Sequence, residues 1–195
     1  MGMLLRNIVA GVLVVALPVI LLMTDRHWVL SDQHRAVAHV ADIPPNLSGE
    51  LTRDLDRIVY YGGIHVPREP TKAEQLYRVL VLTGRAPPAQ LTLDRTPPRY
   101  GYSVREWSFL GMPFGWYEEY GYVVYARDRW QLVMAPLIPE ADAQLMKEVG
   151  RDLKRGFFFP FWAHLWGWLY VALVALWGWL YHRGVVEWRR AEGVM

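Results

Sequence analysis

Histidines are the side chains best suited to acid–base or metal chemistry in this sequence, because the chain contains no cysteine. That absence excludes thiolate nucleophiles, disulfides and cysteine-ligated zinc or iron–sulfur centres. His27, His34 and His39 lie close together along the chain. His34 and His39 are at i and i+5, so they would not share one face of a helix, as two histidine ligands at i and i+4 would. We therefore interpret these three as exposed polar residues and predict no metal site.

Two further histidines, His164 and His182, flank an apolar C-terminal segment. An imidazole in such a segment is costly unless it is hydrogen-bonded, hydrated or bound to a metal. Gly178 precedes His182 by one helical turn and leaves room beside the ring for a flat macrocycle. This spacing resembles that of bacteriochlorophyll-binding antenna polypeptides, over a stretch of five residues. The resemblance implies bacteriochlorophyll or haem at His182; the alternative is an interfacial histidine, next to Arg183, that binds nothing. We predict no other cofactor.

Carboxylates and nucleophiles form no catalytic pattern. Glu118 and Glu119 are adjacent, so in an extended segment their side chains point to opposite faces and cannot act as a facing pair. The positions of Glu106 and Asp128 in the sequence match no catalytic motif. The sequence also contains no nucleophile elbow, P-loop or HExxH motif. We therefore predict that the chain is not an enzyme.

Aromatic residues crowd the stretch 107–130, and exposed Trp and Tyr are typical of binding hot spots. We predict that Phe114, Trp116 and Tyr117 bind a partner protein, because glycines flank them in an apparent turn between two strands. Trp107 and Tyr122 are predicted to lie in strands and to belong to the core. The alternative is a sheet that packs all of these aromatics inside.

An N-terminal apolar run, Ile8 to Thr24, is uncharged and just long enough to cross a bilayer. A cleaved signal peptide is the competing interpretation. The nearest Ala-x-Ala, at Ala36 and Ala38, lies well beyond the apolar core, whereas signal peptidase sites follow that core closely. We therefore predict an uncleaved anchor helix over residues 1–24.

A second apolar run, Gly156 to Tyr181, carries no charged residue and is rich in Trp. It predicts a membrane-spanning helix over 156–182, followed by a short basic tail over 183–195. Gly156, Gly167 and Gly178 recur at a constant interval that keeps them on nearly one stripe of a straight helix. Such a stripe permits close approach of a partner helix, or of the first anchor through Ala10 and Gly11.

Charge distribution indicates the class of partner and the orientation. Acidic and basic residues balance within 25–155, and a neutral domain excludes nucleic acid as a partner. Arg6 and the Arg-bearing tail place both termini in the cytoplasm and the domain outside it, in a bacterial-type inner membrane. Basic residues on the domain side of the second segment argue against this, but long domains cross largely regardless of charge.

The region 25–155 reads as one soluble domain. We expect helices over 28–41 as an extension of the anchor, over 47–63, over 71–84 behind a Thr71–Glu74 capping box, and from Pro139 toward the second span. Strands are expected over 100–110, 121–126 and 130–135. Helices followed by a small antiparallel sheet and another helix predict an α+β fold.

These features favour a non-catalytic accessory subunit that docks on a larger integral membrane complex, such as a photosynthetic or respiratory one. Its partners would be other membrane subunits and the lipid bilayer. The alternative is an extracytoplasmic sensor that signals through partner helices, since the tail is too short for an output domain. A membrane-bound enzyme is the third hypothesis.

Overall fold

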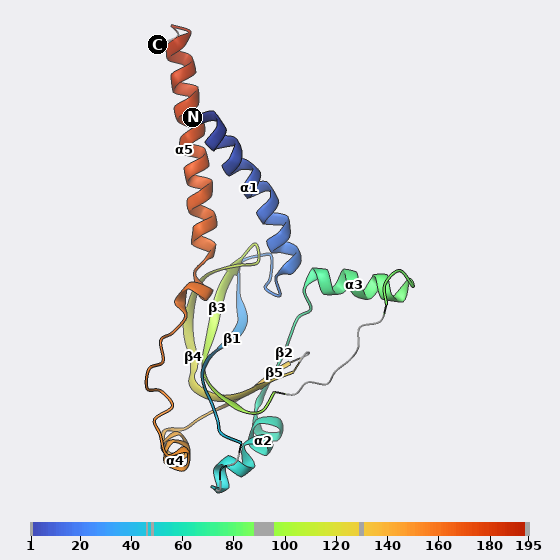
Figure 1. Cartoon of the computed structure of the whole chain (residues 1–195), viewed down its shortest axis with the longest axis vertical. Helices are drawn as coiled ribbons and strands as arrows, with labels where there is room; N and C mark the ends of the chain where they lie inside the picture. The colour runs from blue at the N-terminus through green and yellow to red at the C-terminus, as the bar shows by residue number, and fades with distance from the viewer. Residues whose placement is uncertain (1, 46, 48, 88–95, 129–130, 194–195) are drawn as a thin grey trace.

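The computed structural model describes residues 2–45, 47, 49–87, 96–128 and 131–193. Two long helices leave one end of a curved sheet side by side, and shorter helices lie at the other end or extend to the side (Figure 1). The helices are α1 (Gly2–Met23), α2 (Glu50–Gly62), α3 (Lys72–Leu82), α4 (Pro139–Val149), the 3-10 helix η1 (Phe161–His164) and α5 (Gly167–Ala191). The strands are β1 (Ser31–Asp42), β2 (Ile64–Pro67), β3 (Arg99–Phe109), β4 (Met112–Arg127) and β5 (Gln131–Pro136).

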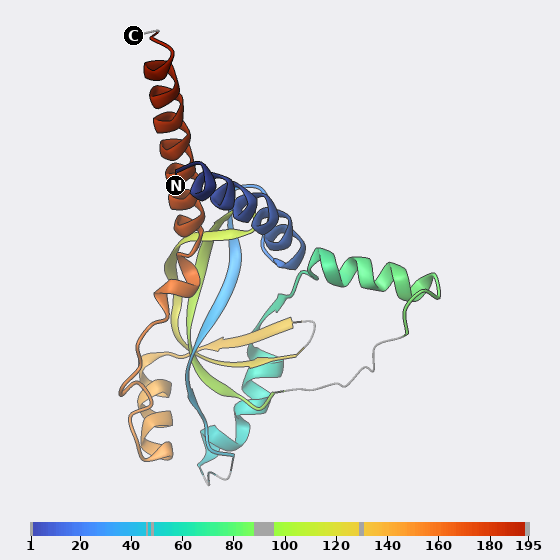
Figure 2. The same ribbon diagram turned by 45° about the horizontal axis from the view of Figure 1, so that its top comes forward.

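All strand pairs in the described part of the chain are antiparallel, in the order β1-β3-β4-β5-β2, which confirms the α+β class. Successive side chains of a strand point to opposite faces. Val124 accordingly joins a core formed with Val59 of α2 and Leu145 of α4, whereas Val123 joins a second cluster with Met134 on the other face. The strong curvature of the sheet is visible in both views (Figures 1 and 2).

Three of the predicted helices are present. α2 presents Leu55 and Val59 to the core, as its apolar stripe predicted. α3 begins at the predicted capping box, in which Thr71 accepts a hydrogen bond from the Glu74 backbone. α4 starts with Pro139 and ends at Gly150, which adopts the left-handed conformation at φ 72°.

The helix predicted over 28–41 is wrong: residues 31–42 form β1. Val37 and Val40 fit a helical stripe, but in the strand they pack against different core clusters, and pairing with β3 determines the structure. Register partners run from Ser31↔Ser108 to Asp42↔Arg99. Tertiary pairing thus overrides a weak local pattern.

The turn predicted around Trp116 and Tyr117 is also wrong, because both lie inside the continuous strand β4. The chain reverses instead at Leu110 and Gly111, whose φ angles are 50° and 72°. Positive φ at both positions is the geometry of a two-residue type I′ hairpin. β3 agrees with the strand predicted over 100–110, while Trp130, predicted to open the last strand, lies outside the described residues.

α5 begins at Gly167 rather than at 156 and continues to Ala191. Residues 151–166 form a strap that runs along the sheet and ends in η1 (Figure 1). Gly156 sits in this strap at φ 85° and is not on a helical stripe with Gly167 and Gly178. The glycine stripe predicted from the sequence is therefore reduced to the last two positions.

Two helices of the described chain, Leu4–Met23 and Gly167–Ala191, are long and apolar enough to cross a membrane. They pack antiparallel, as the Arg6 guanidinium over the Tyr181 ring and a hydrogen bond from the Tyr170 hydroxyl to the Leu13 carbonyl show. The predicted contact through Gly11 is not made, because a Cβ added there would meet nothing within 4 Å.

Candidate functional site

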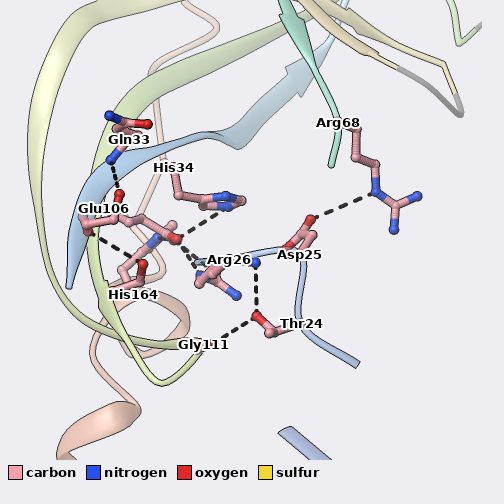
Figure 3. A network of polar contacts seen from close by, with 11 residues as sticks. Thr24, Asp25, Arg26, Gln33, His34, Arg68, Glu106, Gly111 and His164 are labelled. Atoms are coloured by element: carbon pink, nitrogen blue, oxygen red, sulfur yellow. Dashed lines mark hydrogen bonds and ion pairs between the residues drawn. The ribbon is translucent and has the colours of Figure 1, made fainter. Parts of the chain in front are cut away.

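A fully buried carboxylate, Glu106, lies between the bases of the two long helices (Figure 3). Arg26 donates two hydrogen bonds to it, from Nε to Oε2 at 2.7 Å and from Nη2 to Oε1 at 3.2 Å. Nε2 of His34 lies 3.5 Å from Oε2, and Nδ1 of His164 forms a short hydrogen bond with Oε1. One carboxylate is thus surrounded by a guanidinium and two imidazoles, here called the Glu106 junction.

Each member of the Glu106 junction comes from a different segment. His34 is the register partner of Glu106 on β1, so the two side chains share a face of the sheet. Arg26 follows the end of α1, and His164 closes η1 just before α5. The carboxylate therefore connects the sheet to the bases of both long helices.

The β3–β4 turn fixes the segment that carries Arg26. Backbone N–H groups of Leu110 and Gly111 donate to the carbonyls of Trp28 and His27 at 2.9 and 3.2 Å. The Thr24 hydroxyl donates to the Gly111 carbonyl at 2.9 Å. A positive φ at Leu110 is unfavourable for a side chain of this size, and these contacts hold the turn in that conformation.

The surroundings of Glu106 favour its charged form. Burial raises the pKa of a carboxyl, but hydrogen bonds from His164 and Arg26 outweigh burial and lower the Glu106 pKa from 4.5 to about 2. Burial lowers the pKa of His34, aided by the Arg26 charge, while Glu106 opposes that change. Glu106 is an ionised acceptor whose oxygens are occupied, so it is unsuited to act as a general base.

The strap packs aromatic rings against this same face of the sheet. Phe159 stacks on His164 with ring centroids 5.0 Å apart and contacts Trp116 at 4.1 Å. Phe114 meets Trp168 edge-on at 5.5 Å. Trp116 and Phe114, predicted to bind a partner, are half-buried and contact other rings of the chain, and their binding to a partner stays a prediction.

The opposite face carries a second ionic group. Glu119 accepts hydrogen bonds from Arg35 Nε at 2.9 Å and from Arg105 Nη2 at 2.6 Å. These arginines line a cavity of about 700 Å³ beside β1, β2 and β5. Glu118 points the other way and accepts a hydrogen bond from the Tyr102 hydroxyl at 2.6 Å, as adjacent residues of a strand should.

Two aromatic residues predicted to be core differ in outcome. Tyr122 does pack on the core, stacked on Tyr100 with ring centroids 5.4 Å apart. Trp107 is 55% exposed, so its predicted burial is wrong. It lies on the same face as Arg105, where the strap does not reach. Tyr117, whose register partner is Arg105, is 38% exposed on that face.

The locations of several histidines differ from those predicted from the sequence. The sequence prediction treated His34 as an exposed polar residue, but it belongs to the Glu106 junction. His164 is buried at the sheet rather than inside the second apolar helix. His182 and Gly178 lie on α5, and ligation of bacteriochlorophyll or haem there stays a prediction. Among the described residues, no group of three or more His, Asp or Glu side chains could hold a metal ion.

Glu106 is the residue that sequence reasoning missed. A usable signal existed: Tyr100, Tyr102 and Val104 alternate with small or polar residues, and Glu106 continues that apolar series, which places a carboxylate on the covered face. In comparisons with known proteins, no family model, curated protein or solved structure matches the chain.

Proposed function

We propose that this chain is a non-catalytic accessory subunit, anchored by α1 and α5 in a bacterial-type inner membrane, that docks on a larger integral membrane complex. Both termini lie in the cytoplasm and the domain lies outside it. The observation that supports docking is the uncovered middle of α5. A photosynthetic or respiratory complex is the kind of partner that we propose.

The position of Gly178 on α5 and the residues beside it support a docking surface there. Gly178 lies roughly 16 Å along α5 from Gly167 at ~1.5 Å per residue, within the uncharged stretch that ends before Arg183. Trp177 and Trp179 flank it and are exposed. Trp is enriched in binding hot spots, so a small residue between two exposed Trp side chains suits contact with a partner helix.

Space beside Gly178 fits the same proposal. A Cβ added there would meet nothing within 4 Å, so α1 does not occupy this side of α5. Small residues let helix backbones approach closely in lipid, where packing rather than the hydrophobic effect drives association. Gly178 and the exposed Tyr117 are the predicted partner-binding residues that we retain, whereas a Cβ at Gly167 would lie 2.6 Å from the Pro113 carbonyl within the chain.

Replacement of Gly178 with Leu should weaken this association, because the new side chain would hold a partner helix away. We expect the wild-type chain, purified in mild detergent, to carry other integral membrane chains at a fixed ratio. Gly178→Leu should reduce that ratio about tenfold or more, equivalent to ~1.4 kcal/mol, and Gly178→Ala should reduce it less.

Gly11→Leu is the matched control, because Gly11 on α1 also faces open space and should tolerate the same added volume. Each variant should unfold at the wild-type temperature, which separates docking from folding. A wild-type chain that purifies alone, or a Gly178→Leu variant that retains its partners, would refute the docking proposal.

A second candidate, an extracytoplasmic sensor, is supported by the Glu106 junction. Because one carboxylate contacts the segments that lead into α1 and α5, a change at the domain would alter both helices together. A sensor would associate with its partner only under particular conditions, whereas an accessory subunit would co-purify at a constant ratio. The same purification therefore discriminates between the two.

A further inference from the structure

The helix α3 stands apart from the domain. It extends sideways from the base of α1, away from α5 and from the sheet (Figures 1 and 2). None of its residues is buried. Its first turns lie beside the end of α1, where Met23, Ala73 and Tyr77 line one shallow hollow. A helix of this length gains its stability from packing, so its uncovered apolar surface requires an occupant.

Leu76, Val79 and Leu82 are each more than half exposed. Leu76 and Val79 are three positions apart and lie on one side of α3, with Leu80 beside them, whereas Leu82 lies further round the helix in its last turn. Glu74 and Arg78 lie on the side opposite Leu76. A short helix with an apolar side and charged residues opposite it is the pattern of helices that lie in the plane of a membrane interface.

The level of α3 matches the membrane boundary defined by α1 and α5. Both bases meet the β3–β4 hairpin: Thr24 bonds to Gly111, and Gly167 packs on Pro113. α3 contacts α1 at this same end.

Interfacial residues mark the same level. The Trp28 indole donates to the Leu21 carbonyl at 3.2 Å, and the Lys72 ammonium of α3 lies 5.9 Å from the centre of the Trp28 ring. Trp and Lys are favoured at the headgroup level.

We infer that α3 lies flat in the headgroup layer on the domain side of the membrane, with Leu76 and Val79 at the boundary of the acyl chains. Its occupant is the lipid surface itself. The helix then acts as a third contact that fixes the tilt of the domain over the bilayer. This inference rests on the proposed membrane crossing of α1 and α5, but not on any partner complex.

Fluorescence quenching tests the position of α3 directly, and the absence of cysteine from the chain allows single-site labels. Leu76→Cys and Val79→Cys carry a bimane label in the full chain, reconstituted alone in phosphatidylcholine nanodiscs with nitroxide-bearing lipids. We expect quenching by a nitroxide placed near the headgroup to exceed that at Asp54→Cys, an exposed position on α2, about threefold or more. Val14→Cys, exposed on α1, should be quenched best by a nitroxide deep in the acyl chains.

The outcomes separate the two proposals. Labels at 76 and 79 that behave like the label at 54, while the label at 14 is quenched, would overturn the placement of α3 and leave the spans intact. An unquenched label at 14 would instead refute the membrane crossing. If positions 76 and 79 are unquenched in nanodiscs but shielded from an aqueous maleimide in native membranes, a protein covers α3 and the lipid inference is wrong.

Discussion

Replacement of Glu106 with Gln is expected to lower the free energy of unfolding by about 3–5 kcal/mol, because it removes the charge that compensates Arg26 at a buried site and one acceptor oxygen of the junction. The amide keeps the volume of the carboxylate, so the loss reports charge and hydrogen bonding rather than a cavity. Denaturant titration of the full chain in detergent measures it. Glu118→Gln is the matched control: Glu118 is exposed, and its loss should cost less than about 1 kcal/mol.

Lowering the pH should reduce the stability of the wild-type chain for the same reason as Glu106→Gln does. The folded-state pKa of Glu106 is lowered from 4.5 to about 2, so its stabilisation is present above pH 4.5 and is lost as the pH falls toward 2. His34 adds a loss that begins as the pH falls below 6.5, since its folded-state pKa is lowered and the unfolded chain takes up the proton first. In Glu106→Gln the loss between pH 4.5 and 2 should shrink. An unchanged profile together with wild-type stability would show that the junction contributes little.

Trp116→Ala is expected to cost about 2–3 kcal/mol of stability, somewhat below the ~3–5 kcal/mol typical of fully buried Trp, because Trp116 is half-buried. The truncation removes the surface on which Phe159 rests and so loosens the strap that positions His164. Thermal unfolding and denaturant titration of the full chain both report the change.

Trp107 provides a control of the same residue type on the neighbouring strand. It is 55% exposed, so Trp107→Ala should cost less than about 1 kcal/mol. The expectation from sequence had the opposite order, with Trp107 inside and Trp116 outside. If Trp107→Ala proves the more damaging, the packing of the strap against β4 is wrong.

Elements with local chemical signals could be predicted from sequence. The Thr71–Glu74 capping box marks the start of α3, and Pro139 with Gly150 brackets α4, because each satisfies backbone groups of its own helix. The type I′ turn at Leu110 gave no such signal, since Asn-Gly or Asp-Gly is the recognisable pair. Contacts with residues 27 and 28 hold that turn, and sequence spacing does not reveal them.

The C-terminal apolar run shows a limit of hydropathy. Residues 156–166 are as apolar and aromatic as α5, yet they cover the sheet, with Phe157 and Phe159 packed around Tyr102. Burial against a domain and burial in lipid select the same residue types. Pro160, just before η1, was the available sign that the helix begins later.

The members of the Glu106 junction could not be predicted from their spacing in the sequence alone. Arg26 and His164 lie 80 and 58 positions away from Glu106. Only the register of β1 with β3, itself hidden by the mistaken helix over 28–41, brings His34 to the same face. The mistaken helix therefore concealed His34, whereas Arg26 and His164 reach Glu106 only through the tertiary fold.

Labelling of intact cells tests the two-span anchor most directly. Asp54→Cys lies on α2, and Ala191→Cys lies at the end of α5. With both helices across the membrane and the domain outside, a membrane-impermeant maleimide should label position 54 in intact bacterial cells whose outer membrane has been made permeable. Position 191 should react only after the inner membrane is opened. Equal labelling of both positions in intact cells would contradict the two-span anchor, and the reverse pattern would contradict the orientation.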